Sequence, residues 1–294
     1  MTPLLVVGIA ALALAAVRRA VVRHVEQADA ALPRTPDGVL TGADGFRLDR
    51  PGAPGVLLLH GGGDTPQTLR ELGERLHAAG FAVAAPLLPG HGRSVRDFRH
   101  VNARDLQAAA LAAYDALHAG RPWTAIVGLS MGGALAALTA AARPDAAALV
   151  LLAPYLELPA HLRVVAALAG AVGVLSPYYP SEDRRSTRDP AARARGLAYG
   201  VFTPAALRAL RDTADAAAAA LPRVRAPTLI VQSERDNRVA PAVATRALGR
   251  LGTADKRLAW VSDGGHVITV DYGKERVFAL AEEWLRRHGA GALL

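Results

Sequence analysis

The sequence contains no cysteine, and this absence excludes several kinds of chemistry. Disulfide bonds, thiol nucleophiles and thiolate metal sites all require cysteine. The nine histidines also form no His-x-x-x-His or His-x-His pair, the spacings typical of many metal centres. We therefore expect neither a metal ion nor an organic cofactor.

Lysine and aromatic residues are scarce. Aromatic residues make up 5% of the chain, and nearly all of the 34 basic residues are arginines. The formal net charge of +8 is scattered, with no stretch in which basic and aromatic residues alternate. We therefore expect no nucleic-acid partner. Compositional bias or attraction to anionic lipid accounts better for the charge.

Charged residues are few as well, at 20% of the chain against 51% hydrophobic residues. This balance excludes a disordered chain. A length of 294 residues is enough for one α/β domain of about 200–250 residues with an insertion or an extra segment.

An uncharged apolar run, Pro3–Val17, lies at the N-terminal end and is followed by Arg18 and Arg19. As a helix it would span about 22 Å, short of the roughly 30 Å of a bilayer core. Adding Ala20–Val22, with the arginines snorkelling, brings the run near the needed length. The charges follow the run, which favours a single membrane helix over residues 3–22 with the rest of the chain in the cytoplasm. A helix of a soluble cytoplasmic protein and a cleaved export signal remain alternatives.

The most informative stretch is a short apolar strand, Thr124–Leu129, that runs into Gly-x-Ser-x-Gly and then into the helix-forming residues Ala134–Ala142. A nucleophile on a sharp strand-to-helix turn needs small neighbours two residues to either side. Gly128 and Gly132 meet that need around Ser130. Ser130 is therefore the candidate nucleophile.

Three further fragments, far apart in the sequence, carry residues that could work with a serine nucleophile. The glycine-rich loop His60–Gly63 follows the apolar strand Val56–Leu59, Asp236 follows the apolar strand Pro227–Gln232, and His266 follows the last expected strand. Their order along the chain is oxyanion loop, serine, aspartate, histidine, which is the order of α/β-hydrolases and differs from that of the chymotrypsin and subtilisin folds.

With these motifs the sequence resembles the α/β-hydrolase superfamily over about Val56–Leu285. Within it, Pro89–Gly92 and Gly265–Ile268 with Asp271 look like the bacterial carboxylesterase and monoacylglycerol lipase group. The resemblance implies an α/β fold with a mostly parallel sheet flanked by helices and a helical cap insertion. The N-terminal apolar helix would be an addition to that fold.

The resemblance also assigns roles to particular residues. Ser130 would attack, His266 would act as base, and Asp236 would orient the histidine, with Glu234 the closest rival and Asp263 a weaker one. The backbone N–H groups of Gly62 and Met131 would form the oxyanion hole, with Gly63 an open alternative to Gly62. By the same resemblance, His91 is expected to be a structural loop residue and Asp271 to help fix the histidine loop.

Between Leu156 and Arg225 the alternation of strands and helices stops. We expect helices over Ala160–Leu175, Ala191–Val201 and Pro204–Leu221, a loop over Ser176–Pro190 and no strand. An insertion at this place resembles the cap of the family. The expected organisation is an N-terminal apolar helix at 1–27, the hydrolase core at 28–155, the cap at 156–225 and the remainder of the core at 226–294.

These patterns predict a serine hydrolase that cleaves carboxylic esters of short- to medium-chain acyl or monoacylglycerol type. Lysophospholipase, thioesterase and peptidase activities on the same residues remain alternatives. From another class of function, a non-catalytic binding protein of the same fold, held at a membrane, is a further alternative. The sequence does not determine the oligomeric state.

Overall fold

The computed structural model describes residues 3–181 and 186–289. The expected N-terminal segment, the Ser176–Pro190 loop and the C-terminal part of the core therefore lie partly outside the described residues, at positions 1–2, 182–185 and 290–294.

The described strands form a seven-stranded sheet at the centre of the molecule, in the order β1-β3-β2-β4-β5-β8-β9. β1 at one edge is antiparallel to β3, and every other neighbouring pair is parallel. This arrangement confirms the expected α/β fold with a mostly parallel sheet. The strands span Phe46–Leu48 (β1), Gly55–Leu59 (β2), Ala82–Ala85 (β3), Thr124–Leu129 (β4), Ala148–Leu152 (β5), Thr228–Ser233 (β8) and Lys256–Val261 (β9).

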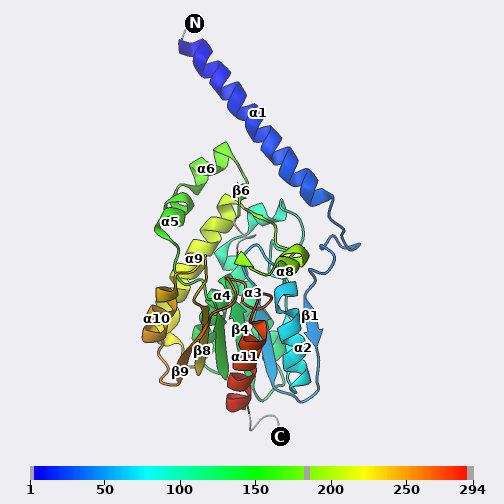
Figure 1. Ribbon diagram of the computed structural model, residues 1–294, viewed down its shortest axis with the longest axis vertical. Helices are drawn as coiled ribbons and strands as arrows, with labels where there is room; N and C mark the ends of the chain where they lie inside the picture. Colours follow the sequence, from blue (N-terminus) through cyan, green and yellow to red (C-terminus); the bar gives the residue numbers. More distant parts are fainter. Residues whose placement is uncertain (1–2, 182–185, 290–294) are drawn as a thin grey trace.

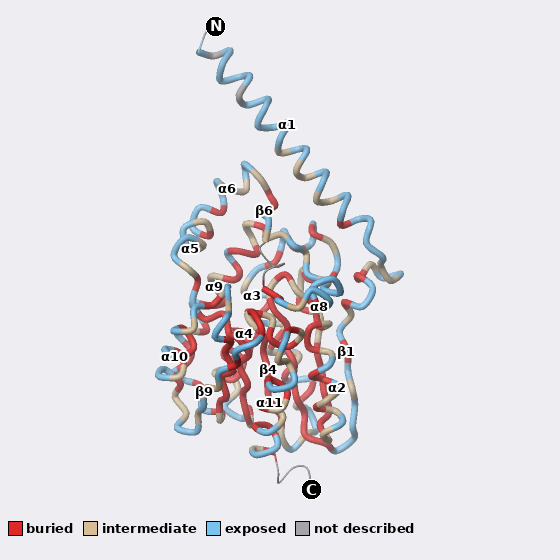
Figure 2. Tube along the Cα trace, in the orientation of Figure 1, coloured by how far each residue is buried: buried red, intermediate tan, exposed pale blue. Residues whose placement is uncertain are grey.

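Helices cover both faces of the sheet, and the apolar residues form one core on each side. α3 (Ala103–His118), α4 (Met131–Ala142) and α10 (Pro241–Arg250) pack on one face, while α2 (Arg70–Ala78) and α11 (Lys274–Gly289) pack on the other. Figure 2 shows the buried residues concentrated in this central layer. Because β2, β4, β5 and β8 are covered on both sides, every residue in them is buried, without alternation between buried and exposed positions.

The segment after β5 is mainly helical, but two details of the sequence prediction are wrong. The helix expected over Ala160–Leu175 is divided into α5 (Ala160–Ala167) and α6 (Ala169–Leu175), because Leu168 leaves helical geometry at φ −88° and ψ 9°. The helix expected over Ala191–Val201 is only α8 (Pro190–Arg195).

Two short strands also occur in this segment, where we expected none. β6 (Tyr179–Pro180) pairs antiparallel with β7 (Val201–Phe202). A two-residue strand is too short to leave a periodic pattern in the sequence, so only the fold reveals it. The last long helix, α9 (Pro204–Ala220), agrees with the expected range to within one residue.

The N-terminal helix α1 (Pro3–Ala30) extends away from the body of the molecule (Figure 1). It is longer than the predicted run, and by length and composition it is apolar enough to cross a membrane. Figure 2 shows that most of its residues are exposed. Large apolar side chains such as Val7, Leu12 and Val17 are at least 61% exposed, so the body of the molecule does not cover this part of the helix.

Candidate active site

Ser130 lies at the turn between β4 and α4. Its backbone has a φ of 56° and a ψ of −119°, a strained conformation for a residue with a side chain. The turn is held by the Ser130 amide, which donates to the Leu152 carbonyl at 2.9 Å, and by the Ser130 carbonyl, which accepts from the Tyr155 amide at 3.0 Å. The neighbouring strand thus fixes the corner that presents the hydroxyl.

The two flanking glycines allow this turn to pack. A Cβ atom on Gly132 would overlap the carbonyl oxygen of Leu59, and one on Gly128 would overlap the carbonyl oxygen of Gly132. The helix α4 can therefore start immediately after Ser130 and lie directly on β2. Its positive N-terminal end, at Met131, is next to the serine hydroxyl.

Three side chains from three different loops meet at this corner. His266, in the loop after β9, has its Nε2 atom 2.7 Å from the Oγ of Ser130, across 136 residues of sequence. Its Nδ1 atom lies 2.8 Å from the Oδ2 of Asp236, which follows β8. The side chains of His266 and Asp236 are only 7% and 0% exposed. This arrangement can pass a proton from a hydroxyl to an imidazole and stabilise the imidazolium with a carboxylate.

The surroundings of Asp236 keep it ionised. Burial raises the pKa of this carboxyl, but the positive charge of a protonated His266, the hydrogen bond to its ring and the amides of Val239 and Arg238 together outweigh burial, so the pKa lies below its ordinary value. The two amides donate to Oδ1 at 2.9 and 2.7 Å. Oδ2 also accepts a hydrogen bond from Nε2 of Gln232 at 2.8 Å.

The two rival carboxylates, Glu234 and Asp263, do not contact the His266 ring. Glu234 and Asp263 are both exposed, and the carboxylate of Asp263 accepts from its neighbour Ser262. Within the described part of the chain, the hydrogen bonds of the His266 ring are to Asp236 and Ser130. The geometry therefore favours Asp236 over both alternatives.

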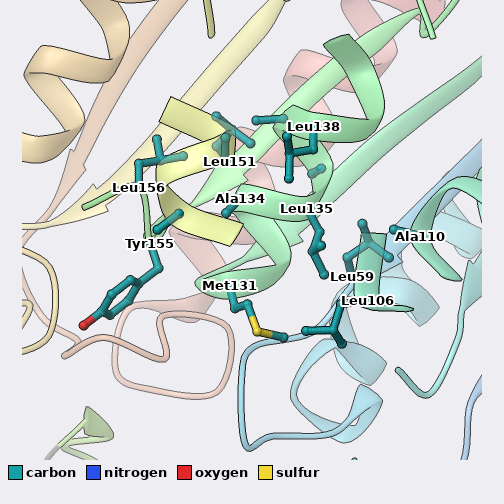
Figure 3. Close-up of a cluster of buried hydrophobic side chains, with 14 of the residues drawn as sticks. Leu59, Leu106, Ala110, Met131, Ala134, Leu135, Leu138, Leu151, Tyr155 and Leu156 are labelled. Carbon is teal, nitrogen blue, oxygen red and sulfur yellow. The ribbon is translucent and has the colours of Figure 1, made fainter. Parts of the chain in front are cut away.

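Gly62 and Met131 lie together beside the serine. A Cβ on Gly62 would be 3.1 Å from the Sδ atom of Met131, and Gly62 lines the same pocket as Ser130. Among the described residues, no protein acceptor takes the amide of Gly62 or of Met131. Figure 3 shows Met131 at the start of α4 with its side chain directed toward Leu106. Two adjacent unpaired amides can bind a developing negative charge.

Gly63 is the alternative to Gly62 as an oxyanion donor, but its backbone makes a different contact. Its φ of 73° is in the left-handed region, and its carbonyl accepts a hydrogen bond from the Tyr199 amide at 3.1 Å. It does not line either of the two pockets that contain Ser130. This placement favours Gly62 as the donor.

His60 and His91 are buried behind the oxyanion loop, where neither ring reaches Ser130. The Nδ1 atom of His60 contacts the Gly61 carbonyl at 2.9 Å, and its Nε2 accepts from the Leu88 amide at 3.1 Å, an arrangement that requires the neutral ring. Burial, with the neighbouring His91 ring, lowers the pKa of His60 to about 3. Burial lowers the pKa of His91 to about 4. Both therefore act as neutral supports of the loop.

A cavity of about 460 Å³ opens from Ser130 and His266. The segment between β5 and β8 forms much of its wall. The apolar residues that this segment contributes are Leu162, Val165, Phe202, Leu207 and Leu210. The aromatic ring of Tyr155 packs edge-on against His266, with 6.2 Å between ring centroids.

Two supports of this site were not found from the sequence. Gln232 holds Asp236, and the only sequence signal for it is a polar residue within an otherwise apolar buried strand. Arg238 lines the cavity and donates from Nε to the Oγ of Ser186 at 2.7 Å, which joins the aspartate loop to the helical segment. No local pattern could indicate this pair, since its members are 52 residues apart.

Asp271 was expected to help fix the histidine loop. Its carboxylate accepts hydrogen bonds from backbone amides of that loop and of the segment before α8. It accepts hydrogen bonds from the amides of Gly265 and Arg188, both at 2.7 Å, and from those of Asp189 and Tyr272, both at 2.8 Å. Four backbone donors on one buried carboxylate connect the histidine loop to the start of α8.

No group of three or more histidine, cysteine or acidic side chains suited to hold a metal ion occurs in residues 3–181 and 186–289.

Comparison with known proteins places these features in a family. The family model described as serine aminopeptidase, S33, matches residues 53–272. A thermostable monoacylglycerol lipase of Bacillus sp. (strain H-257) is 30% identical over 250 residues, covering 85% of this chain and 97% of the relative. A carboxylesterase of Bacillus subtilis (strain 168) is 27% identical over 238 residues, covering 80% and 94%.

The fold is also similar to solved structures. One described with LipS and LipT, two metagenome-derived lipolytic enzymes, superposes with a TM-score of 0.77 at 29% identity and covers 85% of this chain and 100% of its own.

Proposed function

The chain belongs to the serine aminopeptidase S33 family of α/β-hydrolases as an esterase- or lipase-type hydrolase, and we propose that it cleaves carboxylic esters through an acyl-enzyme formed on Ser130. The observation that carries the proposal is the continuous hydrogen-bonded series from Ser130 Oγ through the His266 ring to Asp236, at 2.7 and 2.8 Å.

In the proposed mechanism His266 takes the proton of Ser130 as the hydroxyl attacks the ester carbonyl. Asp236 keeps the ring in the required tautomer and stabilises its charge. The amides of Gly62 and Met131 bind the oxyanion, and one such donor is worth about 3–4 kcal/mol of the barrier. His266 then protonates the leaving alcohol, and water releases the acid by the same steps in reverse.

We infer that the substrate carries a short- to medium-length acyl chain, as in simple carboxylic esters and monoacylglycerols. The relatives are a monoacylglycerol lipase and a carboxylesterase. The helical segment 156–225 acts as a cap, and its apolar residues, of which Leu162 and Leu210 are examples, line the serine pocket. Gly62 places no side chain in that pocket, which leaves its acyl side wide.

Peptide cleavage is a weaker alternative on the same residues. An aminopeptidase must bind the positive N-terminal amine of a peptide, which calls for an acidic partner. The described lining of the 460 Å³ cavity includes Arg238 but no aspartate or glutamate. Asp64 lines the smaller pocket beside Ser130, where its Oδ2 accepts a hydrogen bond from the Thr68 hydroxyl at 2.8 Å. Lysophospholipids and thioesters fit the same mechanism and differ from the proposed substrates only in the leaving group.

We also propose that residues 3–22 of α1 anchor the protein in a membrane, with the catalytic domain on the cytoplasmic side. The helix is long and apolar enough, and its large apolar side chains such as Val7 and Leu12 are exposed rather than covered by the described residues. Arg18, Arg19 and Arg23 follow the apolar run, as the positive-inside rule requires for this orientation.

A fluorophosphonate probe tests the proposal directly, because it labels only an activated serine. We expect covalent labelling of Ser130 in the native chain and none in the folded Ser130→Ala variant. Folded protein that is not labelled would indicate a non-catalytic binding protein. A chain-length series of glycerol and simple esters then tests the substrate, and turnover of acetyl esters alone, or of amides alone, would contradict the acyl-chain assignment.

A further inference from the structure

A second cavity, of about 870 Å³, lies between the C-terminal part of α1 and the body of the molecule. Its size falls within the roughly 300–1,000 Å³ typical of small-molecule sites. One wall is formed by α1 and the residues just after it, and the other by the segments around β6 and β7. The apolar lining includes Val21, Val25, Leu32, Leu40, Leu197 and Val201.

One buried carboxylate interrupts this apolar lining. The side chain of Asp29 is 9% exposed, and its Oδ2 is paired with Nη2 of Arg34 at 2.9 Å. The other oxygen, Oδ1, has no hydrogen-bond partner among the described residues, although the Val95 amide approaches the carboxylate. Asp29 borders the cavity, but Oδ1 itself is shielded from it as the side chain stands. A buried acceptor without a partner is costly, so a rotation of the side chain that lets Oδ1 accept from a ligand hydroxyl would be favourable.

The cavity shares a wall with the serine pocket. Pro180 and Ser181 line both, so a ligand leaving the first cavity need only pass the β6 strand to reach the second. Glu26 of α1 holds this wall in place, since it accepts from the Tyr178 hydroxyl at 2.9 Å, one residue before β6. The same carboxylate pairs with Arg96 at 2.6 Å.

The cavity also lies at the end of the molecule that the proposed anchor turns toward the bilayer. Figure 1 shows α1, α5 and α6 at one end, opposite to the C-terminus. Large apolar residues of α5, α6 and the turn between them are exposed there, including Val164, Leu168 and Val174. A lipid in the adjoining leaflet would meet this end of the protein first.

We propose that the α1 cavity is a binding site for a neutral, hydroxyl-bearing single-chain lipid, which it takes from the membrane and passes across β6 to Ser130. The apolar walls hold the chain, and Asp29 accepts a hydrogen bond from a headgroup hydroxyl. A fatty-acid anion has no hydroxyl to donate to Asp29, so the site discriminates between a monoacylglycerol and its acid product. The transfer step rests on the proposed function, while the binding site itself does not.

Photocrosslinking tests the site without turnover. The full-length Ser130→Ala chain is placed in phospholipid nanodiscs with a decyl glycerol ether that carries a diazirine in its chain. We expect crosslinks to residues 20–32 and 197–201, because both walls line the cavity. Decanoate should compete about tenfold less well than the unlabelled ether, the effect of one charge-assisted hydrogen bond. Crosslinks confined to residues of the serine pocket would overturn the proposal.

A matched pair of α1 variants provides the control. Ala28 lines the cavity, whereas Gln27 is exposed and does not. Ala28→Trp should abolish crosslinking to residues 197–201, and Gln27→Trp should leave it unchanged. Asp29→Asn keeps an acceptor and adds an N–H₂ donor that can bind a carboxylate, so decanoate should then compete as well as the ether. Equal crosslinking in both tryptophan variants would contradict the assignment.

Activity measurements separate the two proposals. With native Ser130, Ala28→Trp should lower kcat/KM for monoacylglycerol in vesicles about tenfold, because the pathway from the membrane is filled. Hydrolysis of a water-soluble butyrate ester should not change. If Ala28→Trp affects neither substrate while Ser130 still reacts with fluorophosphonate, the transfer pathway is wrong and the proposed function stands. If Ser130 does not react at all, the proposed function fails, and the crosslinks alone decide the binding site.

Discussion

The backbone carbonyl of Ser186 accepts a hydrogen bond from the amide of His266 at 2.8 Å. The next amide in the histidine loop, that of Val267, donates to the same carbonyl at 3.1 Å. The segment that covers the serine pocket and the loop that carries the imidazole are therefore joined through the main chain. A displacement of one should move the other.

Asp271 is expected to be a positioning residue for His266, because its carboxylate joins the same two segments. In Asp271→Asn an amide N–H₂ would face backbone N–H donors, and the histidine loop would shift. A misplacement on the order of 1 Å lowers kcat about a hundredfold. The rate of fluorophosphonate labelling should fall in parallel while the protein remains folded. Asp263→Asn, an exposed change in the same loop, should leave labelling unchanged.

Replacing Asp236 should distinguish it from its rival. Asp236→Asn is expected to lower kcat by about 10⁴-fold, because the amide holds the His266 ring in the wrong tautomer. Glu234→Gln, two residues away and exposed, should retain nearly full activity. Ester hydrolysis at saturating substrate measures both. If Glu234→Gln lost activity and Asp236→Asn kept it, Glu234 and not Asp236 would be the partner of His266.

The buried histidines should make the protein sensitive to acid. The folded pKa values of His60 and His91 are lowered to about 3 and about 4, both below the ordinary value of 6.5. As the pH falls below 6.5, the unfolded chain binds protons that the native chain does not, so the free energy of unfolding decreases. Each ring contributes at most about 1.4 kcal/mol per pH unit, down to its folded pKa. Urea unfolding between pH 4.5 and 7 measures this slope.

A single substitution should reduce that slope. His91→Phe keeps a ring against Phe98, which now lies 5.1 Å from the His91 ring between centroids, but it cannot be protonated. The pH dependence should become shallower by at most about 1.4 kcal/mol per pH unit, with the largest change between pH 5 and 6. His100→Gln, an exposed change, should leave the slope as it is. An unchanged slope in His91→Phe would mean that this ring is already charged in the folded protein.

Two glycine substitutions should have opposite effects on stability, because one glycine is tightly packed at the serine turn and the other is exposed in a helix. Gly132→Ala forces a methyl group onto the Leu59 carbonyl and should destabilise the protein by about 3 kcal/mol or more. Gly249, within α10, has no heavy atom within 4 Å of an added Cβ. Gly249→Ala should therefore stabilise the protein by about 0.5–1 kcal/mol through helix propensity. Thermal unfolding followed by circular dichroism distinguishes the two.

Introducing charged residues into α1 tests whether this helix anchors the protein in a membrane. Ile9 and Leu12 are 51% and 73% exposed on α1. The double variant Ile9→Arg/Leu12→Arg adds about 2.5–3.5 kcal/mol per arginine to the cost of insertion. We expect it to move from carbonate-washed membranes to the soluble fraction, whereas Gln27→Arg, beyond the proposed span, should stay bound. A native chain that is entirely soluble would exclude the anchor, and an intact mass that lacks the first residues would indicate a cleaved signal.

The sequence by itself determined the class of fold and the kinds of residue at the site. Apolar runs such as Thr124–Leu129 are long enough to identify buried strands, and the expected range of β4 is identical to the observed one. Local spacing was sufficient to nominate Ser130, since Gly128 and Gly132 are its neighbours in the chain. The uncharged run Pro3–Val17 could also be identified from the sequence, because hydropathy is a local property of the chain.

The tertiary structure decided which distant groups meet. Asp236 and Glu234 are two residues apart and chemically alike, and only the directions in which the folded loop holds them bring Asp236 alone to His266. The bonds of Ser186 and Asp271 use backbone groups, which have no signature in the sequence. The cavity beside Asp29 exists because α1 is held by Arg96 and Tyr178, residues 70 and 152 positions away from Glu26. Such contacts depend on packing across the whole chain, and no local pattern records them.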